Sequence, residues 1–258
     1  MVALLRTALR VALPAAAVLG VVTLGVIRLS SEYESPDGTA DLAAALNHAA
    51  RMMGLAPSAP PSYTIAHPAG ERVELHATPG GDVIERLGAR TEFGSPRTFF
   101  APERRDDWLG VVVPELPNRR LGWIDLKSGQ VEISETQRSL HVDLSRRSLE
   151  IRDGDDLVRR AEVSIGRAGH RTPAGRFAVT DALAGRGLGP WYGCCVLAIS
   201  GHQPNLPPGW VGGDRIAIHG TPGPVGEAVS TGCVRTSDRD MVALFAIVPL
   251  GAPVFIRT

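Results

Sequence analysis

The sequence lacks an excess of charge of either sign. Lysine and arginine together number 27, and aspartate and glutamate also number 27, so the formal net charge is zero. Surfaces that bind nucleic acid usually carry concentrated positive charge. The charge balance therefore argues against a nucleic-acid partner. Nearly all cationic residues are arginine, with Lys127 the single lysine, and we attach no function to this bias.

The sequence also lacks the common spacings of metal ligands. Neither His-Glu-x-x-His nor Cys-x-x-Cys occurs among its seven histidines and three cysteines. We therefore expect no metal and no other cofactor. The three cysteines, Cys194, Cys195 and Cys233, are an odd number, so at least one thiol stays unpaired within the chain. An isolated cysteine is more often inert than reactive, and its neighbouring residues determine whether the thiol is reactive.

Composition is otherwise that of a folded protein. The chain has 258 residues, 44% of them hydrophobic and 21% charged, which is close to the globular average. This length suffices for one large domain or two modest ones. With 29 glycines and 20 prolines, we expect many turns and loops.

The N-terminal segment has the pattern of a membrane-targeting sequence. Arg6 and Arg10 precede an apolar run over residues 11–27, which Arg28 closes. Residues 26–29 offer no small-x-small cleavage site. We therefore expect residues 1–30 to be an uncleaved membrane anchor rather than a cleaved signal. The arginines before the run would keep the N-terminus in the cytoplasm. The body of the protein is then expected outside the membrane, on the cell-wall or periplasmic side.

A linker and a first β-rich region follow this segment. Residues 31–62 are rich in serine, proline and alanine, which favours an extended stalk, with a short helix possible at 41–53. Residues 63–128 contain short β-like runs at 72–76, 83–87, 108–113 and 122–125. Spaced turns between them loosely resemble bacterial Src-homology-type small β-barrels. We expect this region to support the protein or contact the wall, with Trp108 and Trp123 as core or rim aromatics.

Residues 139–258 form a second β-rich region with few helices. Predicted strands occupy residues 141–144, 148–152, 160–165, 175–180, 196–200, 215–219 and 254–256. A helix is expected after Ser237, which can cap it, and Pro249 should end it. The whole chain is therefore predicted to be mainly β.

A histidine and a cysteine lie close together in this second region. The strand ending at His219 is followed by Gly220 and a glycine-rich loop, and then by Gly232 and Cys233. Because side chains alternate along a strand, His219 should emerge on the face opposite to its isoleucine neighbours. An imidazole, the guanidinium of Arg235 and a helix N-terminus each lower a thiol pKa, so we expect a thiolate at Cys233.

These motifs resemble the catalytic domain of the L,D-transpeptidases. That family has His-Gly at a strand end, then Ser-x-Gly-Cys-x-Arg or Asn after a glycine-rich loop. The matching positions here are His219, Gly220, Ser230, Gly232, Cys233 and Arg235. Residues 171–177 (Arg-Thr-Pro-Ala-Gly-Arg-Phe) are similar to an upstream turn of the family, which we interpret as structural. The resemblance covers residues 139–258 and is highly specific.

The resemblance implies an enzyme that acts on peptide stems of bacterial peptidoglycan. Cys233 would be the nucleophile and His219 the general base, oriented by a backbone carbonyl, most plausibly that of Gly220. Ser230 would support the loop, and Arg235 would hold the loop or a substrate carboxylate. The acyl-enzyme would pass to an amine in an L,D-transpeptidase or to water in an L,D-carboxypeptidase. The rival hypothesis is a non-catalytic, membrane-tethered protein that binds the cell wall.

Neighbouring residues complete the predicted site. Many family members have a second histidine where this chain has Thr231, which removes a second imidazole from the site. Backbone N–H groups at Gly232 and Cys233 are the natural oxyanion donors. Tyr192 and His202 lie in a loop that could wall the pocket. The adjacent pair Cys194-Cys195 is interpreted as structural, and we expect neither to bond Cys233.

Overall fold

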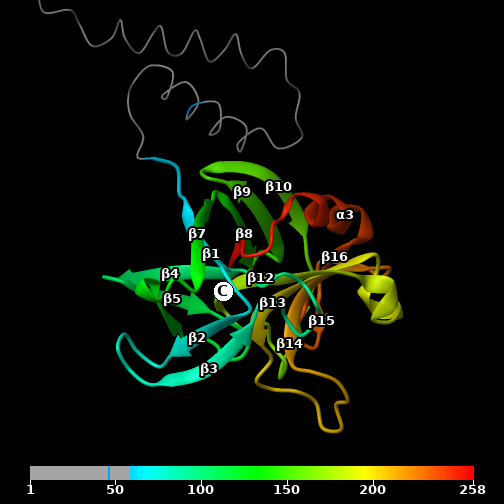
Figure 1. Cartoon of the computed structure of the whole chain (residues 1–258). Helices are drawn as coiled ribbons and strands as arrows, with labels where there is room; N and C mark the ends of the chain where they lie inside the picture. The colour runs from blue at the N-terminus through cyan, green and yellow to red at the C-terminus, as the bar shows by residue number, and fades with distance from the viewer. Residues whose placement is uncertain (1–45, 47–58) are drawn as a thin grey trace, which may run out of the picture. The chain divides into compact units, whose positions relative to one another are not determined.

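The computed structural model describes residues 59–258 together with Leu46 (Figure 1). The predicted anchor at 1–30, the predicted helix at 41–53 apart from Leu46, and most of the predicted stalk at 31–62 lie outside the described residues. No helix in the part described is long and apolar enough to cross a membrane.

A seven-stranded antiparallel sheet makes up the first half of this part. Its strands pair in the order β3-β2-β6-β5-β4-β1-β7. Their bounds are β1 Tyr63–Pro68, β2 Arg72–His76, β3 Val83–Gly88, β4 Phe99–Arg105, β5 Trp108–Val112, β6 Gly122–Asp125 and β7 Val131–Thr136. Side chains in these strands alternate between the core and the surface. In β2, Val73 and Leu75 are fully buried, while Arg72 at the start of the strand is exposed. A short 3-10 helix, η1, spans Leu126–Ser128.

Strand β7 extends this sheet beyond the boundary predicted at residue 128. It pairs with β1 along its whole length, from Tyr63 opposite Thr136 to Pro68 opposite Val131. Trp123 is buried and Trp108 half-buried, as expected of core and rim aromatics. The similarity to small Src-homology-type barrels stays a prediction.

The second half is built on an eight-stranded mixed sheet in the order β10-β9-β8-β17-β12-β13-β14-β16. Its strands are β8 Arg138–Asp143, β9 Ser148–Asp153, β10 Asp156–Glu162, β12 Gly175–Ala184, β13 Cys195–His202, β14 Arg215–Thr221, β16 Val234–Ser237 and β17 Pro253–Arg257. Two short strands, β11 Ile165–Gly166 and β15 Ala228–Ser230, pair in parallel beside it. The 3-10 helices η2 Gly185–Gly187 and η3 Pro190–Tyr192 precede β13.

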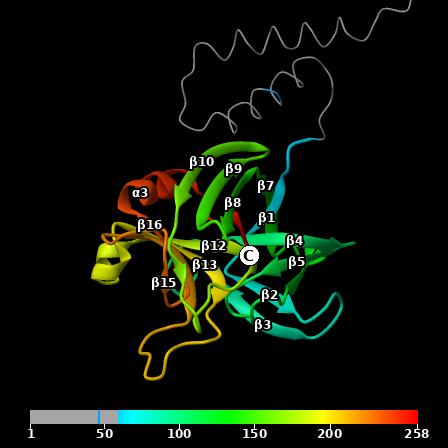
Figure 2. The same ribbon diagram turned by 180° about the vertical axis from the view of Figure 1, so that it is seen from behind.

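One α-helix, α3 (Asp238–Ile247), is present within residues 59–258. The Ser237 hydroxyl accepts a hydrogen bond from the Asp240 backbone N–H, which confirms the predicted cap. Met241 and Leu244 are fully buried, and the helix packs beside β13, β14 and β16. Figures 1 and 2 show α3 at the outer side of the second sheet, away from β2 and β3.

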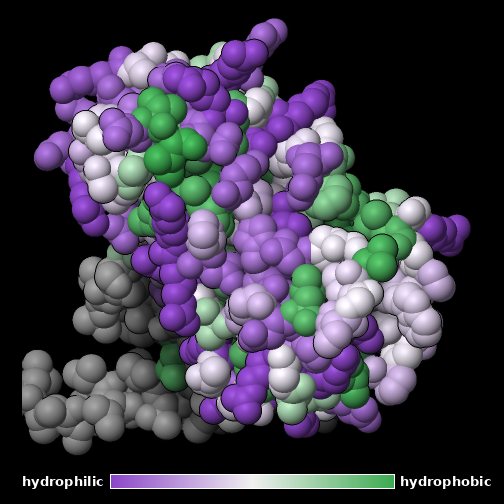
Figure 3. All heavy atoms as spheres, turned by 90° about the horizontal axis from the view of Figure 1, so that it is seen from below, coloured by the Kyte–Doolittle hydropathy of each residue, from purple (hydrophilic) through white to green (hydrophobic). Residues whose placement is uncertain are grey.

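The prediction of a mainly β chain is confirmed, with differences in detail. The strands β1, β4, β7, β15 and β16 were not predicted, and the run predicted at 160–165 divides into β10 and β11. β15 and β16 are short and follow polar or glycine-rich residues, so period-2 patterning is too weak to reveal them. On the face seen in Figure 3, polar residues predominate and apolar residues form separate patches.

Specific side chains join the two sheets. The Asn118 amide donates to the His202 carbonyl oxygen at 2.7 Å and accepts from the His202 backbone N–H at 2.8 Å. Phe100 and Val112 of the first sheet share a buried cluster with Ala178 of the second. Arg215 of β14 pairs with Glu92 at 2.6 Å. These contacts hold loops and strands of the first sheet against β12, β13 and β14, the last of which carries His219.

Asn118→Ala should loosen this junction. It leaves the N–H and C=O of His202 without their amide partner, at a cost of about 1–3 kcal/mol in the free energy of unfolding. Urea denaturation measures this cost, with the exposed neighbour variant Arg120→Ala as control. Equal stability of the two variants would contradict the assigned role of Asn118.

Candidate active site

Strand β14 brings His219 to the site while it fills the core on its other face. Ile216 and Ile218 are buried in the main apolar cluster. Because side chains alternate, Ala217 and His219 lie on the opposite face. The sequence predicted this orientation, and His219 is only 2% exposed.

Parallel pairing of β14 with β16 places Cys233 next to this face. Ile218 lies opposite Val234 and His219 opposite Arg235, so Cys233 comes level with Ala217. The Cys233 thiol makes a hydrogen bond with the Ala217 backbone. The structure leaves Cys233 as a free thiol and pairs Cys194 with Cys195, so no disulfide joins Cys233 to either.

The His219 ring is oriented by its own neighbour. Nδ1 donates to the carbonyl oxygen of Gly220 at 2.7 Å, as the family resemblance implied. Nδ1 therefore carries the proton, and Nε2 is left with a lone pair. Burial, assisted by the positive charge of Arg235, lowers the pKa of His219 to about 4. The imidazole is thus neutral at pH 7 and able to accept a proton.

The expectation of a thiolate at Cys233 is wrong. Burial raises the pKa of the thiol, and this effect outweighs the lowering by the Ala217 hydrogen bond and by Arg235. The sequence could reveal positive neighbours but not the loss of solvent around the sulfur. In its resting state the pair is a neutral thiol beside a neutral imidazole.

The loop before Cys233 is held by buried hydroxyl groups. Ser230 Oγ donates to the Cys233 carbonyl at 2.6 Å and accepts from the Gly232 N–H at 3.1 Å. Thr172 Oγ1 donates to the Gly232 carbonyl at 2.8 Å and accepts from the Gly166 N–H at 2.9 Å. The upstream turn thus has a structural role, as predicted, and ties directly to the nucleophile loop.

Gln203 is a site residue that the sequence analysis missed. Its side chain is 3% exposed, and Nε2 lies within 3.2 Å of three carbonyl oxygens, those of His170, Arg171 and Thr231. Gly232 has φ +119°, and a Cβ there would collide with this amide. No motif in the sequence marks a lone glutamine in a loop, so only the fold identifies this contact.

Two cavities meet at Cys233. A larger one of about 500 Å³ is lined by Glu92, Phe93, Pro114 and Glu115 of the first sheet region and by Tyr192, His202 and Cys233 among others. A smaller one of about 270 Å³ is lined by residues that include Trp191, Tyr192, Gln203, His219, Thr231, Cys233 and Arg235. The thiol can therefore be approached from two sides, and loops of the first sheet region form part of one wall.

Of the two predicted wall residues, Tyr192 lines both cavities and His202 lines only the larger one, and their contacts differ. The Tyr192 ring lies 4.9 Å from the His219 ring, centroid to centroid. Burial and the neighbouring Cys233 raise the pKa of Tyr192. His202 has both ring nitrogens engaged, with Asp214 at 2.9 Å and with the Pro114 carbonyl. His202 therefore joins the two sheet regions rather than facing the thiol with a free nitrogen.

The remaining predicted residues lie at the smaller cavity. Arg235 lines it, and the buried Nε of that guanidinium has no hydrogen-bond partner within the described residues. Thr231 stands where many family members have a second histidine, and its Oγ1 accepts a hydrogen bond from the Arg167 side chain at 3.1 Å. Among the described residues, no group of three or more His, Cys, Asp or Glu side chains is arranged to hold a metal ion.

Thr172→Val should disturb the nucleophile loop. The Gly166 N–H and the Gly232 carbonyl would both lose a buried partner, which costs about 2–3 kcal/mol in the free energy of unfolding. Thr172→Ser keeps the hydroxyl and is the matched control. Urea denaturation compares them, and equal losses in the two variants would contradict the role of the hydroxyl.

The depressed pKa of His219 predicts acid sensitivity. The unfolded chain takes up a proton near pH 6.5, while the folded chain does so only near pH 4. Stability from this group is therefore complete above pH 6.5 and lost as the pH falls towards 4, by about 2–3 kcal/mol. Urea denaturation at pH 7 and 4.5 should show this loss in the wild type and less of it in His219→Gln. An equal acid loss in both proteins would refute the depressed pKa.

Known proteins resemble this region in sequence. Residues 137–256 match the family model YkuD, the L,D-transpeptidase catalytic domain. A putative L,D-transpeptidase YkuD of Bacillus licheniformis is 33% identical over 117 residues, covering 45% of this chain and 62% of that protein. Its namesake in Bacillus subtilis is 28% identical over 118 residues, covering 45% and 63%. The chain thus spans about three fifths of the length of these curated relatives.

Solved structures give weaker matches. An L,D-transpeptidase from Mycobacterium smegmatis aligns with a TM-score of 0.38 at 16% identity, over 62% of this chain and 70% of that chain. One from Stackebrandtia nassauensis aligns with a TM-score of 0.35 at 18% identity, over 47% and 56%. The family model, which matches the segment with His219 and Cys233, confirms the resemblance seen in the motifs. Residues 137–256 are therefore similar to the L,D-transpeptidase catalytic domain.

Proposed function

We propose that this protein is an L,D-transpeptidase that acts on bacterial peptidoglycan through an acyl-enzyme on Cys233. The single observation that carries the proposal is the pairing of a free thiol with a neutral, oriented imidazole. Both Cys233 and His219 line one cavity, and Nδ1 of His219 is fixed by Gly220. The match of residues 137–256 to the L,D-transpeptidase catalytic domain supports the proposed substrate class.

The first half-reaction forms a thioester. The Cys233 sulfur attacks the carbonyl carbon before the terminal D-residue of a tetrapeptide stem, while Nε2 of His219 takes the thiol proton. The backbone N–H of Cys233 is the proposed donor to the oxyanion, because the Gly232 N–H, the other donor expected from the sequence, already donates to Ser230 Oγ. His219 then gives its proton to the leaving D-amino acid as the C–N bond breaks. Because both groups rest in their neutral forms, proton transfer accompanies attack rather than preceding it.

The second half-reaction transfers the acyl group. An amine of a neighbouring stem attacks the thioester, His219 takes a proton from the amine, and the thiol of Cys233 is restored. Water in place of the amine gives an L,D-carboxypeptidase. Arg235 is the proposed partner of a substrate carboxylate, since its buried Nε has no partner within the described residues and its planar fork suits a carboxylate.

The proposed setting is the outer side of the cell membrane. Peptidoglycan lies there, and an N-terminal anchor over residues 1–30 would hold the catalytic domain near it. The region of residues 63–128 would support the domain, because Glu92 and Glu115 already border the larger cavity.

Cys233→Ala should abolish all covalent chemistry. Intact-mass analysis of the full-length chain with a disaccharide-tetrapeptide, alone and with an acceptor amine, should show an acyl adduct on the wild type and none on this variant. His219→Gln should slow adduct formation by about 10²- to 10⁴-fold, because the general base is lost. Melting temperatures close to the wild type would show that both variants fold.

The products separate the competing hypotheses. Cross-linked product supports the transpeptidase, while trimmed tripeptide alone identifies a carboxypeptidase. If the wild type forms neither product nor an adduct, the non-catalytic wall-binding hypothesis replaces the proposal.

A further inference from the structure

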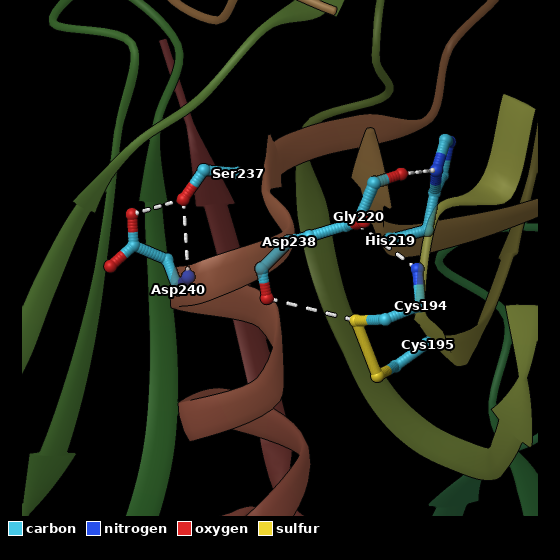
Figure 4. Close-up of a disulfide and its surroundings, with 7 residues drawn as sticks. All are labelled: Cys194, Cys195, His219, Gly220, Ser237, Asp238 and Asp240. Atoms are coloured by element: carbon cyan, nitrogen blue, oxygen red, sulfur yellow. Dashed lines mark hydrogen bonds between the residues drawn. A yellow bond between two sulfur atoms is a disulfide. The ribbon is translucent and has the colours of Figure 1, made fainter. Parts of the chain in front are cut away.

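A disulfide between adjacent cysteines lies beside the strand end that carries the candidate base. Cys194 and Cys195 are bonded to each other where β13 begins, with Cys195 as the first residue of that strand (Figure 4). The Cys194 carbonyl accepts from the Gly185 N–H at 2.9 Å, and Cys195 pairs with Ala184 of β12. Both cysteines are half-buried, so a small reagent in solvent can reach them.

The backbone before this disulfide touches the backbone after His219. A Cβ placed on Gly193 would lie 2.6 Å from the Gly220 carbonyl carbon and 2.8 Å from the Thr221 nitrogen. A Cβ placed on Gly220 would lie 3.2 Å from the Cys194 nitrogen. Neither glycine has room for a side chain, so the two segments are in direct contact. A shift of Gly193 therefore displaces Gly220, whose carbonyl orients His219.

Asp238 fastens this contact. Its Oδ1 accepts from the Cys194 N–H at 3.0 Å, and a Cβ on either Gly193 or Gly220 would collide with the same oxygen. Figure 4 shows Asp238 between Gly220 and Cys194, at the start of α3. Asp238 is the first residue of the helix that was predicted to begin after Ser237. The fold adds that its carboxylate holds two chain segments together.

The same segment carries the aromatic ring that covers the base. Tyr192, in η3, directly precedes Gly193 and lies 4.9 Å from the His219 ring. His219 is thus held by Gly220 through Nδ1 and by Tyr192 on its ring. Both contacts depend on where Gly193 and Cys194 lie.

We propose that the Cys194–Cys195 disulfide and Asp238 together form a positioning clamp, which holds Tyr192 and Gly220 in place and thereby fixes His219 for proton transfer. The proposal rests on the proposed function and assigns it a redox dependence. The disulfide between adjacent residues closes a ring that restricts the backbone at Cys194 and Cys195. The hydrogen bond to Asp238 holds this restricted segment in contact with Gly220. Opening the ring leaves the Asp238 hydrogen bond as the remaining tie.

The opening step is a two-electron exchange with a dithiol. One thiolate of the dithiol attacks a cysteine sulfur, the S–S bond of the protein breaks, and a mixed disulfide forms. The second thiol of the dithiol then attacks this mixed disulfide and releases the remaining protein cysteine as a thiol. The protein gains two thiols, and the dithiol becomes a cyclic disulfide. The Cys194 sulfur lies 3.7 Å from the Asp238 carbonyl oxygen, so the new Cys194 thiol has an acceptor within reach, whereas no such acceptor among the described residues holds Cys195. Cys233 is already free and undergoes no change in this step.

The test compares the full-length wild type before and after dithiol treatment. Iodoacetamide should label one cysteine before treatment and three after it, counted by mass. The rate constant of acyl-enzyme formation from the disaccharide-tetrapeptide should fall about ten-fold or more on reduction, with donor affinity unchanged, because small misplacement of a catalytic group is costly. An unchanged rate constant after complete reduction would overturn the clamp.

Three variants separate positioning from loss of fold. The double variant Cys194→Ser/Cys195→Ser should be as slow as the reduced wild type and insensitive to dithiol. Asp238→Asn keeps an oxygen that accepts the Cys194 N–H and should stay within about two-fold of the wild type, whereas Asp238→Ala should lose about ten-fold. A double serine variant as fast as the oxidised wild type, or an Asn variant as slow as the Ala variant, would contradict the proposal.

A second readout keeps the clamp separable from the proposed function. The alkylation rate of Cys233, followed by peptide mass, reports the thiol and its base without any peptidoglycan substrate. It should also fall on reduction. If the oxidised protein forms no acyl-enzyme, the transpeptidase proposal fails, and this rate alone decides the clamp: equal alkylation of Cys233 in both redox states would refute it.

Discussion

The hydrogen bond from His219 Nδ1 to the Gly220 carbonyl decides which form of the imidazole faces Cys233. It fixes the proton on Nδ1, leaves Nε2 as the acceptor and holds the ring where His219 is only 2% exposed. Burial then makes the protonated ring unfavourable, which brings the pKa of His219 to about 4. Partial burial of Cys233 likewise raises the pKa of its thiol, so both groups rest in their neutral forms. The chemistry proposed for the site depends on this one orientation.

The fold surrounds that bond with rigid neighbours. Parallel pairing of β14 and β16 sets Cys233 beside the strand of His219, and buried hydroxyls of Ser230 and Thr172 hold the loop between them. Gly193 packs on Gly220 from the other side. The precision of the site therefore comes from backbone contacts and short polar side chains, with few long, mobile groups. Such sites are sensitive to small shifts of the main chain.

Local sequence patterns predicted much of this arrangement. The alternation of side chains along β14 predicted the face on which His219 lies. The helix cap at Ser237 could also be predicted, because a capping side chain bonds to the backbone of its own first turn. The family motif indicated the Gly220 carbonyl. The thiolate at Cys233 was predicted wrongly, since positive neighbours are visible in the sequence while burial is a property of the fold. Gln203 and Asp238 were missed because their partners lie in distant segments of the chain.

The proposed chemistry requires a neutral imidazole with its proton on Nδ1 and a protonated thiol at Cys233. Nitrogen-15 NMR of the His219 ring in the full-length protein, titrated from pH 8 to pH 3.5, observes this form directly. We expect a single Nδ1–H tautomer at neutral pH that takes up a second proton only near pH 4. A doubly protonated ring at pH 7, as in a thiolate–imidazolium pair, or a proton on Nε2 would contradict it.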